Sequence, residues 1–255
     1  MVRGPSAVLS RRHHRGFATL AFALAPAAFA YFLAAPLLPA LPAGDTTILV
    51  AGSIGLLLVA ASALAVLPAY EALIAPLLIA LGAGLLVAAC NADGTDGVGA
   101  GANVLEALLA GAAGLLFARW LAAPAVSVAV ALFVSAIDVL SVAFGPTSRL
   151  LEEGTPRVDA LSFDLPAWGD AGSAGHIGFS DAFFVALFAA WAWRFGLRRG
   201  ATIAGLLLGL LAALGLSVAL DEAMPALPFV AAGYLLPNVD RLWRLLARRD
   251  HSASS

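Results

Sequence analysis

The sequence predicts an all-α polytopic membrane protein with about eight transmembrane helices. Hydrophobic residues make up 62% of the 255 residues and charged residues only 12%, and the mean hydropathy is +0.95. A soluble domain carries about twice this share of charged residues. The apolar residues form long continuous runs, whereas a membrane β-barrel would show alternating segments of about ten residues. A soluble enzyme is therefore excluded, and a net charge of −2 gives no sign of a nucleic-acid partner.

Eight apolar segments are long enough to be candidate spans. They lie at 17–41, 47–69, 72–90, 103–122, 124–144, 177–193, 200–220 and 224–239. The first four form an N-terminal transmembrane part, 17–122, and the last four a second part, 123–240. A polar loop, 145–176, separates the fifth span from the sixth. Short tails, 1–16 and 241–255, flank the whole bundle.

The distribution of arginine predicts the orientation, because cytoplasmic loops of membrane proteins are enriched in basic residues. Eight spans place the arginine-rich segments on one face: Arg3, Arg11, Arg12, Arg15, Arg119, Arg194, Arg198, Arg199, Arg241, Arg244, Arg248 and Arg249. The long loop has two arginines against five acids and falls on the other face. Both termini are then cytoplasmic in a multi-pass protein of the cell membrane. Alternatively, "AFA" at 28–30 ends a cleaved signal peptide, which leaves seven spans in the same orientation.

Two aspartates and a broken helix start stand out in the second half of the chain. Asp138 lies inside "ALFVSAIDVLSVAF", where an ionisable group costs several kcal/mol and usually marks a functional site. Asp181 lies near the start of the next span, so both carboxyls fall in the outer half of the membrane. "MPALPF" at 224–229 begins the last span with two prolines, which remove two backbone donors. Taken alone, Asp181 is also explained as a helix-start residue that the helix dipole favours.

These segments, "AIDVLSVAFGP" at 136–146, "GFSD" at 178–181 and "PALP" at 225–228, resemble the presenilin and signal peptide peptidase family of intramembrane aspartyl proteases. That family has Tyr-Asp on one helix, Gly-x-Gly-Asp on the next and Pro-Ala-Leu at the start of the last, with a long loop between the aspartates. The resemblance extends from Val126 to Val239 and implies a presenilin-like bundle.

The chain departs from the family pattern at two positions. Ile137 stands where the family has Tyr, and Ser180 stands where it has the second Gly. A serine at that place is strained only if the position requires a positive φ. The chain also has one span fewer than the family, and the predicted orientation is that of signal peptide peptidase rather than presenilin.

The resemblance implies that Asp138 and Asp181 form a catalytic dyad that hydrolyses peptide bonds within transmembrane segments or signal-peptide remnants. Two adjacent carboxyls do not both ionise easily, so one is the base and the other the acid, and the pair titrates as a unit. Such a dyad needs neither metal nor cofactor. The partners would be transmembrane substrates and the lipid bilayer, without nucleic acid.

A transmembrane substrate must unwind to be cut, and pairing it as an extended strand would satisfy its freed backbone groups. Two segments are candidates for this contact. Pro225, Ala226, Leu227 and Pro228 would leave backbone groups exposed at the site. "LSFDL" at 161–165, which includes Leu161 and Phe163, alternates with period two and predicts a short strand. The glycine-rich segment at 169–178, which ends at Gly178, predicts a flexible gate or a plain linker.

Three other interpretations remain open. A prepilin-peptidase-type aspartyl enzyme also uses Gly-x-Gly-Asp, but it leaves "PALP" unexplained and the chain has no lysine. A secondary transporter uses broken helices and intramembrane acids, and an inverted repeat would favour it. An inactive presenilin-like protein that binds other membrane proteins fits the departures at Ile137 and Ser180.

Overall fold

The computed structural model describes residues 26–42, 44–71, 74–92, 99–144, 162–169 and 173–253. This part of the chain is mostly helical. Four of its helices are long and apolar enough to cross a membrane: Asp45–Glu71, Ala102–Trp120, Pro124–Phe144 and Arg199–Leu220. They indicate a helical membrane protein, as the composition predicts.

The helices follow one another with short connections. The first half contains an apolar helix at Pro26–Leu37 that ends in η1 (Ala35–Leu37), then α2 (Asp45–Thr47), η2 (Ile48–Gly52), α3 (Ser53–Ala65), η3 (Leu67–Glu71), α4 (Ala75–Ala92), α5 (Gly99–Trp120) and α6 (Pro124–Phe144). The second half contains β1 (Ser162–Pro166), β2 (Ser173–Gly178), α9 (Phe179–Arg194), α10 (Arg199–Leu220), α11 (Leu227–Leu235), η4 (Leu236–Asn238) and α12 (Val239–Ala253).

Within the described residues each expected span contains a helix, but only the four helices named above are long and apolar enough to be spans. The helix α9 has 16 residues and α11 has 9, against the roughly 20 that a span needs. The helix α9 starts late because the strand β2 occupies the residues before Phe179. The helix α11 starts at Leu227 rather than at 224, after the first of the two prolines. Part of the first expected span, 17–41, lies outside the described residues.

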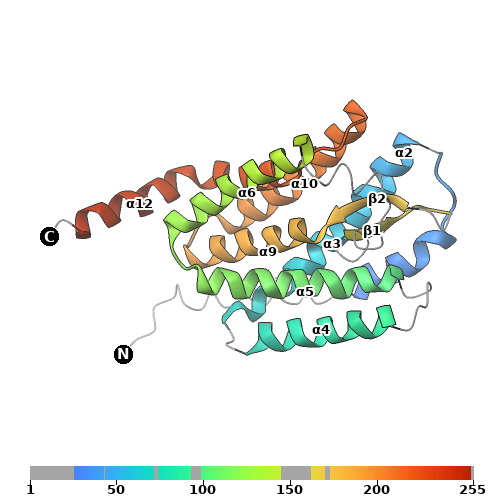
Figure 1. The fold of residues 1–255 in the computed structure, drawn as a ribbon, viewed down its shortest axis with the longest axis horizontal. Coiled ribbons are helices and arrows are strands. Elements are labelled where there is room, and N and C mark those ends of the chain that lie inside the picture. Colours follow the sequence, from blue (N-terminus) through green and yellow to red (C-terminus); the bar gives the residue numbers. More distant parts are fainter. Residues whose placement is uncertain are drawn as a thin grey trace.

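The long helices lie side by side along one axis (Figure 1). The helix α5 packs against α4, α3 and α9, and α11 packs against α10, α6 and α9. One end of the bundle carries β1 and β2, the end of α6 and the starts of α9 and α11; we call it the hairpin end. The opposite end carries Arg119, Arg194, Arg198, Arg199 and the start of α12; we call it the arginine end.

Small residues allow the helices to approach closely, as is usual between membrane helices. The helices α10 and α11 cross where Gly205 and Gly233 face each other, and a Cβ on either would clash with the backbone of the other. Gly209, one turn further along α10, lies directly against the backbone of Phe229. On the other side of the bundle, a Cβ at Gly114 would lie 2.7 Å from the carbonyl oxygen of Phe183. Glycine at these places fixes which helices are neighbours.

The helix α9 forms the centre of the bundle and α6 its edge. Phe188 and Trp191 of α9 are fully buried, and the ring of Phe188 stacks on that of Tyr234 with centroids 4.9 Å apart. By contrast, Phe133 and Leu140 of α6 are exposed. A protein in water would cover such side chains, so this surface suits contact with lipid.

The two strands form an antiparallel hairpin in which Asp164 lies opposite His176. Asn103 of α5, only 3% exposed, donates to the carbonyl oxygen of Asp164 at 2.5 Å and accepts from its N–H at 3.2 Å. The strand expected at 161–165 therefore forms, one residue later. The expected flexible gate at 169–178 is wrong for residues 173–178, because this segment is the second strand.

Candidate functional site

Asp138 lies on α6, six residues before the end of the helix, and its carboxyl group contacts the start of α11. Its Oδ2 accepts a hydrogen bond from the N–H of Leu227 at 2.9 Å, and the N–H of Ala226 also acts on this carboxyl. At 1.5 Å per residue, Asp138 is about 9 Å from the hairpin end of α6. The structure thus joins the first aspartate directly to the "PALP" segment.

The start of α11 offers these donors for a local reason. The first N–H groups of a helix have no acceptor within the helix, and they need a partner from elsewhere. Proline at 225 and at 228 carries no N–H, so Ala226 and Leu227 are the donors that remain between them. Asp138 therefore caps α11 from a neighbouring helix.

Asp181 lies in the first turn of α9 and caps its own helix. Its Oδ2 accepts from the N–H of Gly178 at 3.1 Å. Ser180 is helical, and among the described residues Asp221 alone has a positive φ without being glycine, so the serine in place of the family's glycine causes no backbone strain. A Cβ at Gly178 would lie 3.3 Å from Asp181 Oδ2, so a side chain there would press on the carboxyl group.

The fold brings the two aspartates together at the hairpin end. Both α6 and α9 pack against α11, and the charge of Asp138 acts on the Asp181 carboxyl. A hydrogen bond of 2.9 Å between Ser127 and Tyr234 ties α6 to α11. Two carboxyl groups thus lie at the N-terminal ends of two helices, where the helix dipoles favour negative charge.

One edge of the hairpin faces this site. The backbone groups of Asp164 point to Asn103, so those of His176, directly opposite, point to the other edge of the sheet. Gly178, two residues along β2, donates from this same edge to Asp181. The outer edge of β2 therefore leads to one of the two carboxyl groups.

The other predicted contact residues have different positions. Ala226 precedes the first turn of α11, and Leu227 begins that helix and is buried. Phe163 is fully buried and stacks on Phe179; its side chain holds the hairpin to α9 and presents no surface to a ligand. Leu161 lies outside the described residues.

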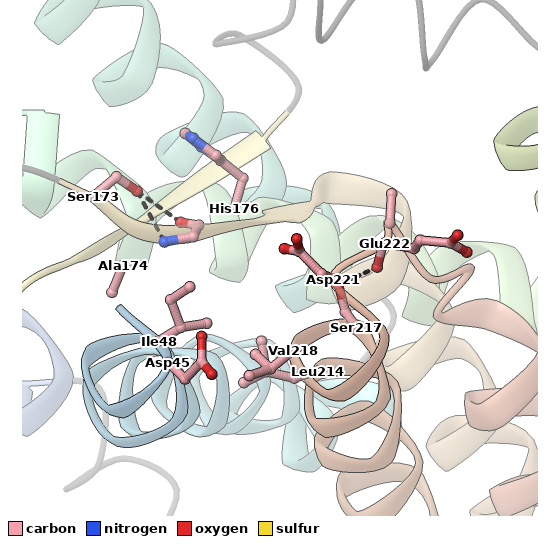
Figure 2. Close-up of a pocket in the computed structure, with 12 residues that line it drawn as sticks. Asp45, Ile48, Ser173, Ala174, His176, Leu214, Ser217, Val218, Asp221 and Glu222 are labelled. Carbon is pink, nitrogen blue, oxygen red and sulfur yellow. Dashed lines mark hydrogen bonds between the residues drawn. The ribbon is translucent and has the colours of Figure 1, made fainter. Parts of the chain in front are cut away.

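A cavity of about 500 Å³ opens between β2, α2 and the end of α10. Its lining residues are Asp45, Ile48, Ser173, Ala174, Gly175, His176, Leu214, Ser217, Val218, Asp221, Glu222 and Ala223. The carboxyl groups of Asp45 and Asp221 point into the space, and that of Glu222 points away (Figure 2). Neither Asp138 nor Asp181 lines it. Two of its walls continue along the chain into the site, because β2 leads to Asp181 and Ala223 leads to the start of α11.

Polar residues that the sequence analysis did not single out hold this arrangement. They are Asn103, Ser127 and Tyr234, all buried. In the sequence they are visible only as polar residues inside apolar segments, and the sequence does not show with which groups they form hydrogen bonds. Within the described ranges, no group of three or more His, Cys, Asp or Glu is placed to hold a metal ion.

Comparisons with known protein families, with curated proteins and with solved structures find no match for this chain.

Proposed function

We propose that this protein is an intramembrane aspartyl endopeptidase in which Asp138 and Asp181 form the catalytic dyad. The observation that carries the proposal is that two carboxyl groups from different helices lie near enough for the charge of Asp138 to act on Asp181, one at the start of α11 and the other at the start of α9. Intramembrane acids are costly, and a pair of them is hard to explain by packing alone. The proposal includes the resemblance to presenilin and signal peptide peptidase, with eight spans in a presenilin-like bundle.

The dyad would act through a water molecule between the carboxyl groups. One carboxylate removes a proton from the water, whose oxygen attacks the carbonyl carbon of the scissile peptide bond. The protonated carboxyl gives its proton to the carbonyl oxygen, and a neutral tetrahedral diol forms. When the diol collapses, the C–N bond breaks and the nitrogen takes up a proton, which yields a carboxyl and an amino terminus. Either aspartate fits either role.

The hairpin suggests how the substrate would bind. An unwound substrate segment has free N–H and C=O groups, and an open strand edge satisfies them by β-strand addition. The outer edge of β2, with the backbone groups of His176, would take this strand and lead its peptide bonds toward Asp181, which accepts from Gly178 two residues further on. The cavity beside β2 would receive the end of the substrate outside the membrane.

The arginine end supports a cytoplasmic location for both termini, by the same rule that applies to the sequence. The dyad would then lie in the outer half of the membrane. Transmembrane segments and signal-peptide remnants that enter from the lipid beside α6 fit this position.

The test must separate catalysis from helix capping, since both aspartates also accept hydrogen bonds from helix starts. The side-chain oxygen of asparagine can still accept these hydrogen bonds, but asparagine is not an acid or a base. We expect Asp138→Asn and Asp181→Asn each to abolish cleavage of a labelled transmembrane peptide by the reconstituted protein, while the melting temperature stays close to that of the wild type. Glu106→Gln, which removes a half-buried carboxyl of α5 outside the site, is the matched control and should keep its activity.

A second candidate follows from the same two hydrogen bonds. If the aspartates serve only as caps, the protein is an inactive presenilin-like protein that binds membrane segments. In that case the wild type cleaves none of a varied peptide panel and does not bind a transition-state-like aspartyl protease inhibitor, although it is folded.

A further inference from the structure

A second cavity lies at the arginine end, far along the bundle from the aspartates. It has a volume of about 320 Å³ and lies between the turn after α9 and the first turns of α12. Phe195 and Gly196 form one wall, and Arg241, Arg244 and Leu245 form the other. The cavity therefore combines two guanidinium groups with two apolar side chains.

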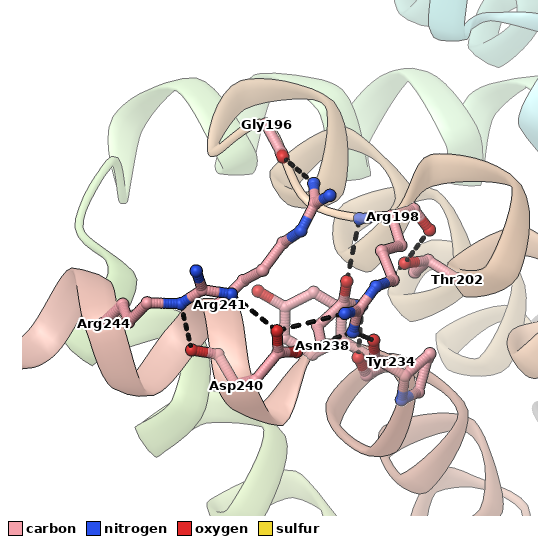
Figure 3. A network of polar contacts seen from close by, with 9 residues as sticks. Gly196, Arg198, Thr202, Tyr234, Asn238, Asp240, Arg241 and Arg244 are labelled. Carbon is pink, nitrogen blue, oxygen red and sulfur yellow. Dashed lines mark hydrogen bonds and ion pairs between the residues drawn. The ribbon is translucent and has the colours of Figure 1, made fainter.

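The charges around this cavity are unbalanced. Arg198 makes a bidentate ion pair with Asp240, at 2.6 and 3.0 Å, and Arg244 contacts the same carboxyl at 2.7 Å. Arg241 donates to the carbonyl oxygen of Gly196 at 2.7 Å, so it is held in place by a neutral group. Two guanidinium groups thus pair with a single carboxylate, and a third, that of Arg241, is bonded to a backbone carbonyl oxygen (Figure 3).

The arginines keep donors for a further anion. A guanidinium has five N–H donors in a rigid fork. Arg241 uses one of them in the contact with Gly196. Arg244 uses its Nε on the Asp240 carbonyl oxygen and one terminal nitrogen on the Asp240 carboxyl. The donors that remain suit the oxygens of a phosphate, which arginine binds with good geometry.

The position of the cavity is that of a membrane surface. The spanning helix α10 begins at Arg199 and α6 begins at Pro124, both at this end. Trp120 and Trp243 are 77% and 73% exposed there, and tryptophan is enriched where the hydrocarbon meets the headgroups. The helix α12 runs on past the end of the bundle (Figure 1), with Leu242 buried and Trp243 exposed.

We propose that this cavity binds the phosphate headgroup of an anionic membrane lipid, held by Arg241 and Arg244, with its acyl chains against Phe195 and Leu245. Charge complementarity and the apolar wall together favour a lipid over a free anion. A bound lipid would fix α12 to the turn after α9, and thus brace the arginine end of the bundle. The site is separate from the dyad, and it would exist whether or not the protein is a protease.

Native mass spectrometry of the purified full-length protein in detergent tests the proposal. The probes are phosphatidylglycerol, zwitterionic phosphatidylcholine and inorganic phosphate. We expect phosphatidylglycerol to bind most tightly. The double variant Arg241→Gln, Arg244→Gln should bind it about thirtyfold more weakly, since each of the two arginines near a membrane surface contributes about 1 kcal/mol. Arg119→Gln removes a charge at the same end but outside the cavity, and it should bind like the wild type.

The variant Asp240→Asn should change the affinity for phosphatidylglycerol in the opposite direction. It removes the carboxylate that competes for Arg244 and Arg198, so the affinity for phosphatidylglycerol should rise. If the double variant does not fold, this variant still tests whether the cavity binds the lipid. Equal binding of the two lipids, equal losses in the double variant and Arg119→Gln, or an unchanged or lower affinity in Asp240→Asn would overturn the proposal. Displacement of the lipid by inorganic phosphate at a similar concentration would make the site one for free phosphate instead.

Discussion

At the scale of the residue, each aspartate of the proposed dyad has a structural partner that fixes its position. Asp138 receives the N–H of Leu227, and Asp181 receives the N–H of Gly178. A carboxylate at a helix N-terminus is stabilised by the local dipole, which offsets part of the cost of placing it at membrane depth. The helix starts thus allow two carboxyls to lie near each other in an apolar bundle.

The side chain of Asn103 anchors the hairpin beside the site. Its amide is buried and satisfies both backbone groups of Asp164. We expect Asn103→Ala to cost about 1–3 kcal/mol of stability, because it leaves a buried donor and acceptor unpaired. Hydrogen exchange at the Asp164 amide should accelerate in this variant, and cleavage should fall. Unchanged exchange would mean that the hairpin is held by other contacts.

Because of Asp240, we expect the free energy of unfolding to depend on pH. The hydrogen bonds from Arg198 and from Arg244 lower the pKa of its carboxyl. Its folded-state pKa then lies below the unfolded value of about 3.9, so the ionised carboxylate stabilises the fold above that value. This contribution is lost as the pH falls through the folded-state pKa. We expect Asp240→Asn to lower the melting temperature at neutral pH, and the difference from the wild type to shrink in acid. A constant difference across this range would contradict the role of the charge.

At the scale of the element, the crossing of α10 and α11 sets the place where the last helix starts. Gly205 and Gly209 are spaced as in the small-residue motif of membrane helix pairs, and they lie against Gly233 and Phe229. The close approach puts the start of α11 within reach of Asp138 on its other side. The position of the proposed dyad therefore depends on glycines that take no part in the proposed reaction.

Gly205→Leu tests this dependence. The new side chain would meet the backbone of Gly233, so we expect α11 to be displaced, with a lower melting temperature and little cleavage. Gly215→Leu, on the same helix, is the matched control because a Cβ there meets nothing within 4 Å, and it should behave like the wild type. Equal losses in both variants would point to a general effect of glycine substitution in α10.

The positions of the long helices can be predicted well from the sequence, but the elements against which each one packs cannot. Long apolar runs locate α5, α6 and α10 because a span needs about 20 such residues wherever it packs. The short helix α11 is harder to predict, because its start depends on two prolines and on a carboxyl from α6. The second strand was missed because "SAGHIG" has too many small residues to show a strand pattern, and only pairing with β1 makes it one.

At the scale of the whole molecule, the two ends of the bundle carry opposite charge. The hairpin end has Asp45, Asp221 and Glu222 around a cavity, and the arginine end has the cluster around Asp240. By the positive-inside rule, we expect a bundle with this polarity to insert with its arginines on the cytoplasmic side. This orientation would decide from which side substrates reach the proposed dyad and which leaflet supplies the proposed lipid.

Thiol labelling in intact cells measures this orientation. In a background with Cys90→Ser, which removes the single cysteine, one variant carries Glu222→Cys at the hairpin end and another Ser252→Cys near the end of α12. We expect an impermeant thiol reagent to label the first variant in intact cells, and the second only after the membrane is made permeable. This result would place the dyad in the outer half of the bilayer and the arginine cavity at the inner leaflet, where negatively charged lipids attract basic segments. The reverse pattern would move the proposed site to the cytoplasmic half, and substrates would then have to enter from the opposite side.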